Sequence, residues 1–265
     1  MIHLALGLEY NGRPFRGFQR QSGERTVQGE LELALSQVAD EPITIAAAGR
    51  TDTGVHAMGQ VVGFSTNAQR PLHGWQRGAN SLTDANISVR WVREVEAEFH
   101  PRYSAAARRY IYIWCEDEVP SPVLHGLVTP TKPLATGAMH EAGQHLLGEH
   151  DFTSFRGAGC QSRSRHRCVH NLQVRRFADL VALDITANAF LLHMVRNIAG
   201  ALLQVGRQEQ PVAWVPELLR ARDRRLLGPT APPAGLYLAS VYYPQQSFPP
   251  APMPGPLRGL QATAL

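Results

Sequence analysis

A carboxylate and a guanidinium stand two residues apart in residues 49–57, which read Gly-Arg-Thr-Asp-Thr-Gly-Val-His-Ala. If this segment is extended, Arg50 and Asp52 project to the same side, because side chains alternate along an extended chain. Gly49 and Gly54 allow the backbone to turn where a side chain would clash. An acid beside a cation at a loop tip can act as a general acid or base, or as a nucleophile.

The elements around this loop follow from hydrophobic periodicity. The pattern predicts a strand over 2–10, a helix capped by Thr26, strands over about 43–49 and 58–66, a helix over 71–81 and a strand over 87–95. This is the β-α-β-β-α-β order of a ferredoxin-like unit, with Asp52 between its second and third strands.

The second half repeats the order of elements without repeating the sequence. It predicts a strand over 109–115, a helix over 138–147, a hairpin over 168–177 and 180–187, helices over 190–205 and 215–221, and a closing strand over 236–243. The expected fold class is α+β, with two ferredoxin-like subdomains and mainly antiparallel sheets. We expect subdomains over 1–104 and 105–245, and a disordered proline-rich tail over 246–265.

Composition narrows the class of protein. The 265 residues carry a net charge of +4, and Lys132 is the one lysine among 26 basic residues. Arginine forms phosphate forks and stacks on bases, which fits a nucleic-acid partner. No apolar run approaches the ~20 residues of a membrane helix, and no basic leader precedes the first strand. The three cysteines form no Cys-x-x-Cys pair, so we expect reduced thiols and a cytoplasmic protein.

The sequence of residues 49–57 resembles the active-site signature of the A-type tRNA pseudouridine synthases. Further segments resemble the same family in order along roughly residues 4–243, with Phe18 standing where the family usually has tryptophan. These segments are 10–12, Phe15, 17–19, 26–29, 99–103, 108–110, 151–156, 160–163, 193–198 and 235–238.

The resemblance implies an enzyme that isomerises uridines 38, 39 and 40 of the tRNA anticodon arm to pseudouridine. It also implies a homodimer and a cleft between the sheets that contains the Asp52 loop. The reaction breaks the N-glycosidic bond and joins uracil C5 to the sugar carbon that N1 left. No electron is transferred, so neither a cofactor nor a metal is needed, and one carboxylate is the minimum. Asp52 is the predicted catalyst, by proton abstraction at the ribose or by covalent attack.

Three residues have predicted supporting roles. Arg50 could fill the space left by the extruded base, or could form a local ion pair with Asp52. Tyr110 would stack on the uracil, although a strand tyrosine is more often part of the core. Arg196 lies in an apolar helix and needs an acidic partner. The resemblance suggests Asp52, which an adjacent cation would keep ionised, and the alternative is that Arg196 extends to the surface.

The resemblance also marks segments that contact tRNA. The predicted contacts are Arg70, Phe99, His100, Pro101, Arg102, Tyr103, Cys160, Gln161, Ser162, Arg163 and Ser164. If residues 162–168 are extended, Arg163, Arg165 and Arg167 form a basic strip on one face, suited to the phosphate backbone. Arg77 and Arg109 are further candidates.

Two other functions compete with this interpretation. Cys160, His166, Cys168 and His170 are zinc-type ligands, but their spacing lacks the paired knuckle of a structural site, so we expect no metal. A non-catalytic RNA-binding protein of ferredoxin-like fold is the second alternative. The aromatic signature of RNA-recognition motifs is missing from the sequence, and a binder would not need the acid at position 52.

Overall fold

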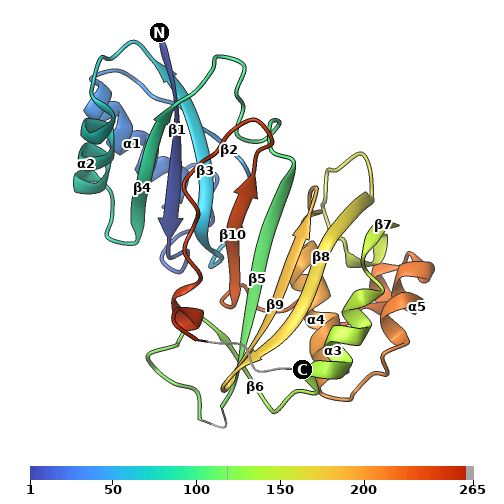
Figure 1. Ribbon diagram of the computed structural model, residues 1–265. Coiled ribbons are helices and arrows are strands. Elements are labelled where there is room, and N and C mark those ends of the chain that lie inside the picture. Colours follow the sequence, from blue (N-terminus) through green and yellow to red (C-terminus); the bar gives the residue numbers. More distant parts are fainter. Residues whose placement is uncertain (118, 261–265) are drawn as a thin grey trace. The chain divides into compact units, whose positions relative to one another are not determined.

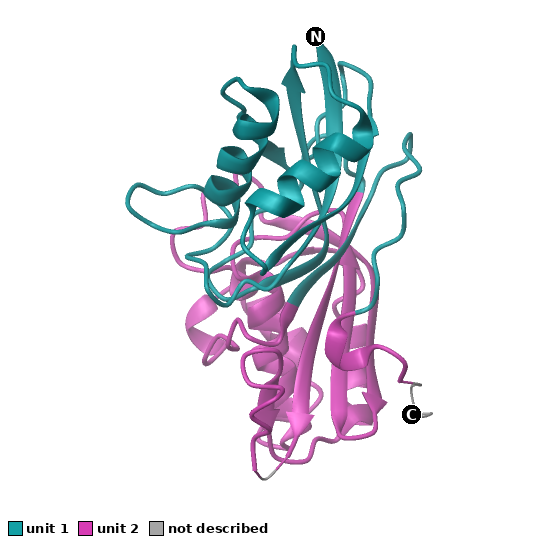
Figure 2. Cartoon of the chain, turned by 90° about the vertical axis from the view of Figure 1, so that its left-hand side faces the viewer, with its two compact units in different colours: residues 1–106, 237–253 teal, residues 107–236, 254–265 magenta. Residues whose placement is uncertain are grey.

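The computed structural model describes residues 1–117 and 119–260. The chain divides into two compact units, coloured separately in Figure 2. Unit 1 contains Met1–Ala106 and Tyr237–Met253, and unit 2 contains Ala107–Leu236 and Pro254–Leu265, whose last five residues lie outside the described part. Helices and mainly antiparallel strands occur in both units, which confirms the predicted α+β class.

Unit 1 is built on an antiparallel sheet with helices on one face (Figure 1). Its elements are β1 (Ile2–Tyr10), α1 (Val27–Ala39), β2 (Ala46–Ala47), β3 (His56–Thr66), α2 (Leu72–Leu82), β4 (Ile87–Glu94) and β10 (Leu236–Tyr242). β1 pairs with both β3 and β4, and β2 pairs with β3. The predicted β-α-β-β-α-β order is present, and Thr26 Oγ1 caps α1 by accepting a hydrogen bond from the Gly29 N–H.

The last strand of the chain joins unit 1. The sequence predicts a strand over 236–243 as the closing element of the second subdomain. The structure has β10 there, and it runs parallel to β3, with Tyr237 opposite His56. A parallel pairing between segments so far apart in the chain leaves no local pattern in the sequence. It brings the C-terminal part of the chain next to the strand that follows the Asp52 loop.

Alternation along β1 and β3 gives the sheet of unit 1 an apolar face and a glycine-rich face. Leu4 lies opposite Phe64, whose ring contacts Trp75 of α2, so these residues mark the helix-covered face. On the other face a Cβ atom at Gly7 would lie 2.1 Å from the Trp91 ring, and one at Gly59 would lie 2.8 Å from Ala251. Side chains of β4 and of the C-terminal segment therefore lie directly on the backbone of this face.

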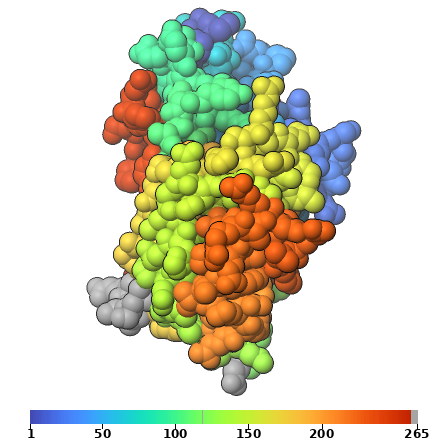
Figure 3. Space-filling model, turned by 90° about the vertical axis from the view of Figure 1, so that its right-hand side faces the viewer, coloured from blue at the N-terminus to red at the C-terminus, as the bar shows by residue number. Residues whose placement is uncertain are grey.

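The C-terminal segment follows this glycine-rich face. Residues 244–253 belong to unit 1, and the Phe248 ring stacks on Trp91 with centroids 4.6 Å apart. In Figure 3 the red C-terminal segment lies beside green atoms of unit 1. Proline content predicts disorder over 246–265, yet Phe248 gives the first part of this segment an aromatic anchor. Residues 261–265 lie outside the described part.

Unit 2 contains further strands, most of them antiparallel, and its own helices. Its elements are β5 (Ala107–Glu116), β6 (Thr129–Thr131), α3 (Thr136–Gln144), β7 (Gly148–Asp151), η1 (Thr153–Phe155), β8 (His166–Phe177), β9 (Leu180–Ala187), α4 (Met194–Gly206), α5 (Trp214–Ala221) and η2 (Arg224–Leu226); a last turn is η3 (Gly255–Leu257). The strand order is β5-β9-β8-β7, with β6 parallel to β5. β6 and β7 are too short for periodicity to predict.

The start of α4 differs from the predicted residue 190. His193 has φ 58, in the left-handed region, so the helix begins at Met194. Its buried residues include Ile198 and Leu202, as the apolar pattern predicts. Arg196 is thus in the first turn of α4.

Candidate active site

The Asp52 side chain comes from a tight turn at the start of β3. The Val55 N–H donates a 3.1 Å hydrogen bond to the Asp52 carbonyl, and Gly54 has φ +79 inside this turn. A positive φ at the third position of a turn favours glycine. The glycine predicted to let the backbone turn therefore does so, and Asp52 is held at the first position of the turn.

The segment that follows β1 contacts the backbone of this turn. The Phe18 N–H donates to the Thr51 carbonyl at 3.0 Å. A Cβ atom at Gly17, where φ is +85, would lie 3.0 Å from the same oxygen, and one at Gly12 would lie 1.9 Å from the Val55 carbonyl oxygen. Only glycine allows the two backbones to approach this closely. The sequence analysis treats residues 10–19 as a family likeness; their structural role is to hold the Asp52 loop.

Hydrogen bonds of buried side chains fix both ends of the loop. The Gln60 amide donates to the Gly49 carbonyl at 2.6 Å, and its oxygen accepts from the Gly49 N–H at 3.4 Å. At the other end, His56 Nδ1 accepts from the Gly12 N–H at 3.2 Å, and its ring stacks on Tyr237 at 4.7 Å. Burial raises the pKa of Tyr237, so this phenol stays neutral.

The result is a fixed backbone with an accessible acid. Thr51 is buried, Asp52 is half-buried, and Arg50 and Thr53 are exposed. Preorganised geometry of this kind is what a reacting group needs, because small displacements of a catalytic atom cost much of the rate. Asp52 and Arg50 thus lie where the sequence predicts, at the tip of a loop on a rigid support.

Tyr110 and Arg196 belong to unit 2. Tyr110 lies on β5, half-buried, and meets the Phe190 ring edge-on with centroids 5.1 Å apart. Arg196 is half-buried, and its Nε donates to the Ala231 carbonyl at 2.8 Å. This bond fixes the orientation of the guanidinium at the N-terminal end of α4. Both side chains are therefore partly accessible and oriented by neighbours in their own unit.

The five predicted contacts at 99–103 divide into two groups. Phe99 is half-buried against the Tyr243 ring, and Pro101 is buried, so both turn inward. In the outward group, Arg102 and Tyr103 are exposed, Tyr103 by 78%, and His100 is half-buried. The His100 and Tyr103 ring centroids lie 4.3 Å apart, and the Arg102 guanidinium carbon lies 5.9 Å from the Tyr103 centroid. An exposed ring beside a guanidinium is suited to stacking on an unpaired base.

The predicted basic strip does not form. β8 begins at His166, so Arg163 and Arg165 precede it and are exposed, while Arg167 turns inward. The Arg167 guanidinium donates to Ser162 Oγ at 2.7 Å, and burial lowers its pKa. The alternation argument fails because serine hydroxyls compete for the backbone and bend this segment.

The remaining predicted contacts are placed as follows. Cys160 and Ser162 are half-buried, Gln161 and Ser164 are exposed, and Arg70 is exposed with its guanidinium on the carbonyls of Val38 and Gln69. Arg109 donates both hydrogen bonds of a bidentate pair to Asp184, at 2.8 and 2.6 Å. Arg109 is therefore an internal ion-pair partner on the sheet of unit 2.

The zinc-type residues do not gather into a metal site. Cys168 Sγ lies 3.7 Å from His170 Nδ1, but within residues 1–117 and 119–260 no three histidine, cysteine or carboxylate side chains are grouped to hold a metal. Across the same residues no helix is long and apolar enough to cross a membrane.

Comparison with known proteins identifies the family. A sequence model described as tRNA pseudouridine synthase matches residues 8–104 and 142–244. The chain belongs to this family. The ranges include the Asp52 loop, the residues that support it and Arg196, while Tyr110 and the C-terminal segment beyond residue 244 lie outside them.

Curated relatives agree along almost the whole chain. Proteins called tRNA pseudouridine synthase A from Cronobacter sakazakii, Shewanella frigidimarina and Escherichia coli are 50%, 48% and 51% identical to it over 258, 263 and 255 residues. The alignments cover 97%, 97% and 96% of this chain and 96%, 98% and 94% of the relatives. This tRNA pseudouridine synthase is therefore an enzyme, an isomerase that modifies tRNA, and the non-catalytic alternative is set aside.

A solved structure described as a Cbf5-Nop10-Gar1 complex is also similar. It has a TM-score of 0.35 and 12% identity over 76% of this chain and 45% of that chain, a level of similarity on which no argument rests.

Proposed function

We propose that this tRNA pseudouridine synthase converts uridines 38, 39 and 40 of the anticodon arm to pseudouridine, with Asp52 as the essential catalytic residue. The observation that carries this proposal is the Asp52 turn. It is clamped by Gln60, by His56 and by the close backbone of Gly12 and Gly17, and it leaves the carboxylate partly exposed. A turn with a merely structural aspartate needs no such set of buried supports.

The chemistry that we assign to Asp52 requires one carboxylate and no redox partner. The bond between uracil N1 and the sugar C1′ breaks, the base turns, and C5 bonds to C1′. The proton on C5 then leaves to solvent and N1 takes up a proton from solvent, so atoms and charge balance without a cofactor. The carboxylate acts either by taking a proton from the ribose or by attacking covalently, and both require it to be ionised and fixed.

Arg50, Tyr110 and Arg196 are the proposed helpers. The exposed Arg50 would enter the space left by the target base and pair with phosphate, because extrusion of a base from its stack costs a few kcal/mol. Tyr110 would stack on the uracil. Arg196, held by the Ala231 carbonyl, would supply the positive charge for Asp52.

The tRNA itself would be bound through two groups of residues. The outward group of the 99–103 segment, His100, Arg102 and Tyr103, offers stacking and charge. The segment 160–164 and the exposed Arg70 would contact the phosphate backbone. In this proposal Phe99 and Pro101 contribute through the position of their neighbours.

We also propose that the enzyme works in the cytoplasm as a homodimer, in which one subunit holds the tRNA body while the other carries out the chemistry. Light scattering after size-exclusion chromatography tests the dimer. A mass twice that of the 29.2 kDa chain is expected, and a monomer that remains fully active would contradict it.

Tritium release tests the reaction and its position together. Purified enzyme is incubated with tRNA transcripts labelled with tritium at uracil C5, in a buffer that contains a metal chelator. We expect release from uridines 38, 39 and 40, measured with transcripts in which these positions are replaced by cytidine one at a time. Release that persists when all three are replaced would place the reaction elsewhere in the tRNA.

A further inference from the structure

Aromatic rings connect the C-terminal segment to the loop proposed to contact tRNA. We call residues 243–253 the strap and residues 99–104 the contact loop; both belong to unit 1. Phe248 of the strap stacks on Trp91, with ring planes 20° apart, and meets Phe99 of the contact loop edge-on at 5.7 Å. It also meets Tyr243 edge-on at 5.4 Å. Edge-to-face pairs at these distances are favourable.

A hydrogen bond adds a second connection. The Tyr243 hydroxyl donates to the Pro101 carbonyl at 2.8 Å, and the Tyr243 ring lies 5.2 Å from Phe99. Pro101 in turn lies on the sheet, because a Cβ atom at Gly63 would be 3.0 Å from its ring. The two inward residues of the contact loop are therefore held between the sheet and the strap.

The outward residues are tied to the inward ones by the loop's own hydrogen bonds. The His100 N–H donates to Ser104 Oγ at 3.0 Å, and the Ser104 N–H donates to the His100 carbonyl at 2.9 Å. His100 Nδ1 accepts from the Arg102 N–H at 3.1 Å. The loop is closed on itself, so a shift of its base moves His100, Arg102 and Tyr103 together.

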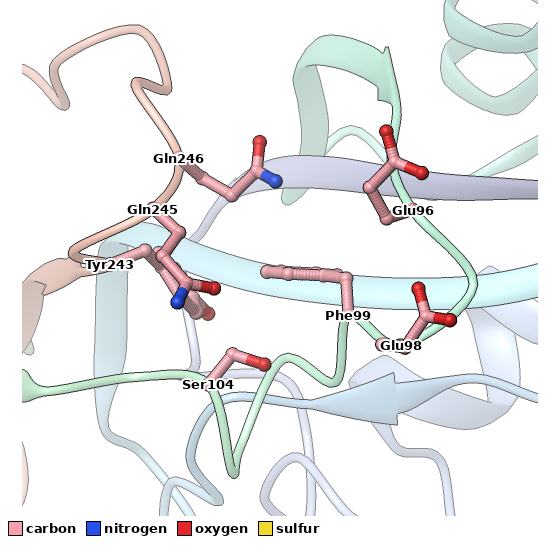
Figure 4. A pocket seen from close by; sticks show the side chains of 7 residues that line it. All are labelled: Glu96, Glu98, Phe99, Ser104, Tyr243, Gln245 and Gln246. Atoms are coloured by element: carbon pink, nitrogen blue, oxygen red, sulfur yellow. The ribbon is translucent and has the colours of Figure 1, made fainter.

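The strap and the contact loop meet at these aromatic rings, and open space remains beside the rings. A pocket of about 190 Å³ opens there (Figure 4). Phe99 lies between the carboxylates of Glu96 and Glu98 on one side and the amides of Gln245 and Gln246 on the other. The family match ends at residue 244, so most of the strap lies beyond it.

We propose that Tyr243 and Phe248 are positioning residues for tRNA binding, which fix the contact loop with His100, Arg102 and Tyr103 in their binding orientation. The inference rests on the proposed role of that loop in contacting tRNA. A loop ordered before binding loses less conformational entropy when RNA binds, so the strap raises affinity without touching the substrate.

The test compares binding and turnover in full-length variants. Phe248→Ala removes the ring, and Tyr243→Phe removes only the hydroxyl that reaches Pro101. The dissociation constant comes from fluorescence anisotropy with a labelled anticodon-arm RNA, and kcat and KM come from tritium release. We expect the dissociation constant and KM of Phe248→Ala to rise about fivefold, with kcat unchanged, and Tyr243→Phe to show a smaller rise.

Three comparisons separate positioning from general stability. Phe248→Trp keeps an aromatic ring and should restore affinity. Met253→Ala truncates an exposed side chain of the same strap and should bind like wild type. In a Tyr103→Ala background, Phe248→Ala should cause a smaller loss than in wild type, because part of its effect passes through Tyr103.

The opposite pattern would overturn the inference. A merely structural strap would lower the folded fraction, and with it the apparent kcat, while KM stayed unchanged. Losses that add fully in the Tyr103→Ala background would have the same meaning. Wild-type enzyme that binds the RNA but releases no tritium would refute the proposed function alone, since the anisotropy of the variants still decides the role of the strap.

Discussion

The hydroxyl groups of Tyr10 and Thr51 share a 2.7 Å hydrogen bond, and both side chains are buried. Thr51 is the residue before Asp52, so this bond links the end of β1 to the backbone that carries the proposed catalytic acid. Support for a reacting group by a buried hydrogen bond one residue away is expected where geometry controls the rate.

Tyr10→Phe removes the hydroxyl that bonds Thr51 and keeps the aromatic ring. We expect Tm to fall by about 3 °C and kcat by about tenfold, because the Thr51 hydroxyl loses a partner and the Asp52 turn gains freedom. Calorimetry and tritium release measure the two effects. Tyr242→Phe, at an exposed tyrosine, is the matched control. A Tyr10→Phe enzyme with full kcat would show that the bond contributes to stability only.

The close approach of Gly17 to the Asp52 loop can be tested with a paired substitution. Gly17 and Gly23 both have positive φ, +85 and +76, but a Cβ atom at Gly17 meets Thr51 while one at Gly23 meets no atom within 4 Å. Both alanine variants should lose about 1–2 kcal/mol of stability from the backbone conformation. Only Gly17→Ala should also lose activity, by about tenfold or more. Equal activity in the two variants would mean that the loop tolerates the displacement.

Residues whose roles depend on local geometry could be predicted from the sequence. The alternation of Ile2–Tyr10, the Thr26 cap of α1 and the glycine-bracketed Asp52 loop each depend on neighbours within a few residues. The predicted reaction came from the likeness of residues 49–57 to a family signature. Hydrophobic periodicity predicts secondary structure and carries no information on the reaction. The family match then confirmed the family as a whole.

Long-range pairings could not be predicted in this way. The parallel contact of β10 with β3, the stack of Phe248 on Trp91 and the support of Thr51 by Tyr10 join segments far apart in the chain. Arg167 shows a second limit of prediction from sequence. The spacing of Arg163, Arg165 and Arg167 places their side chains on one face only if the backbone is extended. Serine hydrogen bonds bend it before β8 begins.

The ion pair between Arg25 and Asp84 predicts a pH dependence of stability. Hydrogen bonds from Arg25, then from the Asn86 backbone and side chain, lower the pKa of Asp84 from 3.8 to about 2. Because the folded pKa is lower than the unfolded one, the contribution is complete above pH 3.8 and is lost as the pH falls through 2.

We therefore expect Asp84→Asn to lower Tm by about 1–2 °C at pH 7, since the pair is exposed and screened by solvent. The difference from wild type should shrink as the pH falls from 4 toward 2. Thermal unfolding at pH 7, 4 and 2.5 measures it. A difference that stays constant over this range would show that Asp84 contributes through its shape rather than its charge.

Arg196 is the proposed charge partner of Asp52, and a charge-conserving variant tests this role. Arg196→Met should lower kcat by about a hundredfold, because the Asp52 carboxylate would lose its counter-charge. Arg196→Lys keeps a positive charge and should lose clearly less. Arg207→Met, on the same helix with its guanidinium on Thr131, is the control and should keep near-wild-type kcat. Equal kcat losses in Arg196→Met and Arg196→Lys would show that the charge of Arg196 does not act on Asp52.

The most direct measurement is tritium release by Asp52→Asn, compared with Asp40→Asn. The two variants make the same chemical change, and Asp40 is exposed at the end of α1 with φ 58, a conformation that asparagine adopts readily. If Asp52 is the catalyst, Asp40→Asn releases tritium at the wild-type rate, whereas Asp52→Asn binds tRNA and releases none. Release by Asp52→Asn at a rate close to wild type would contradict the account.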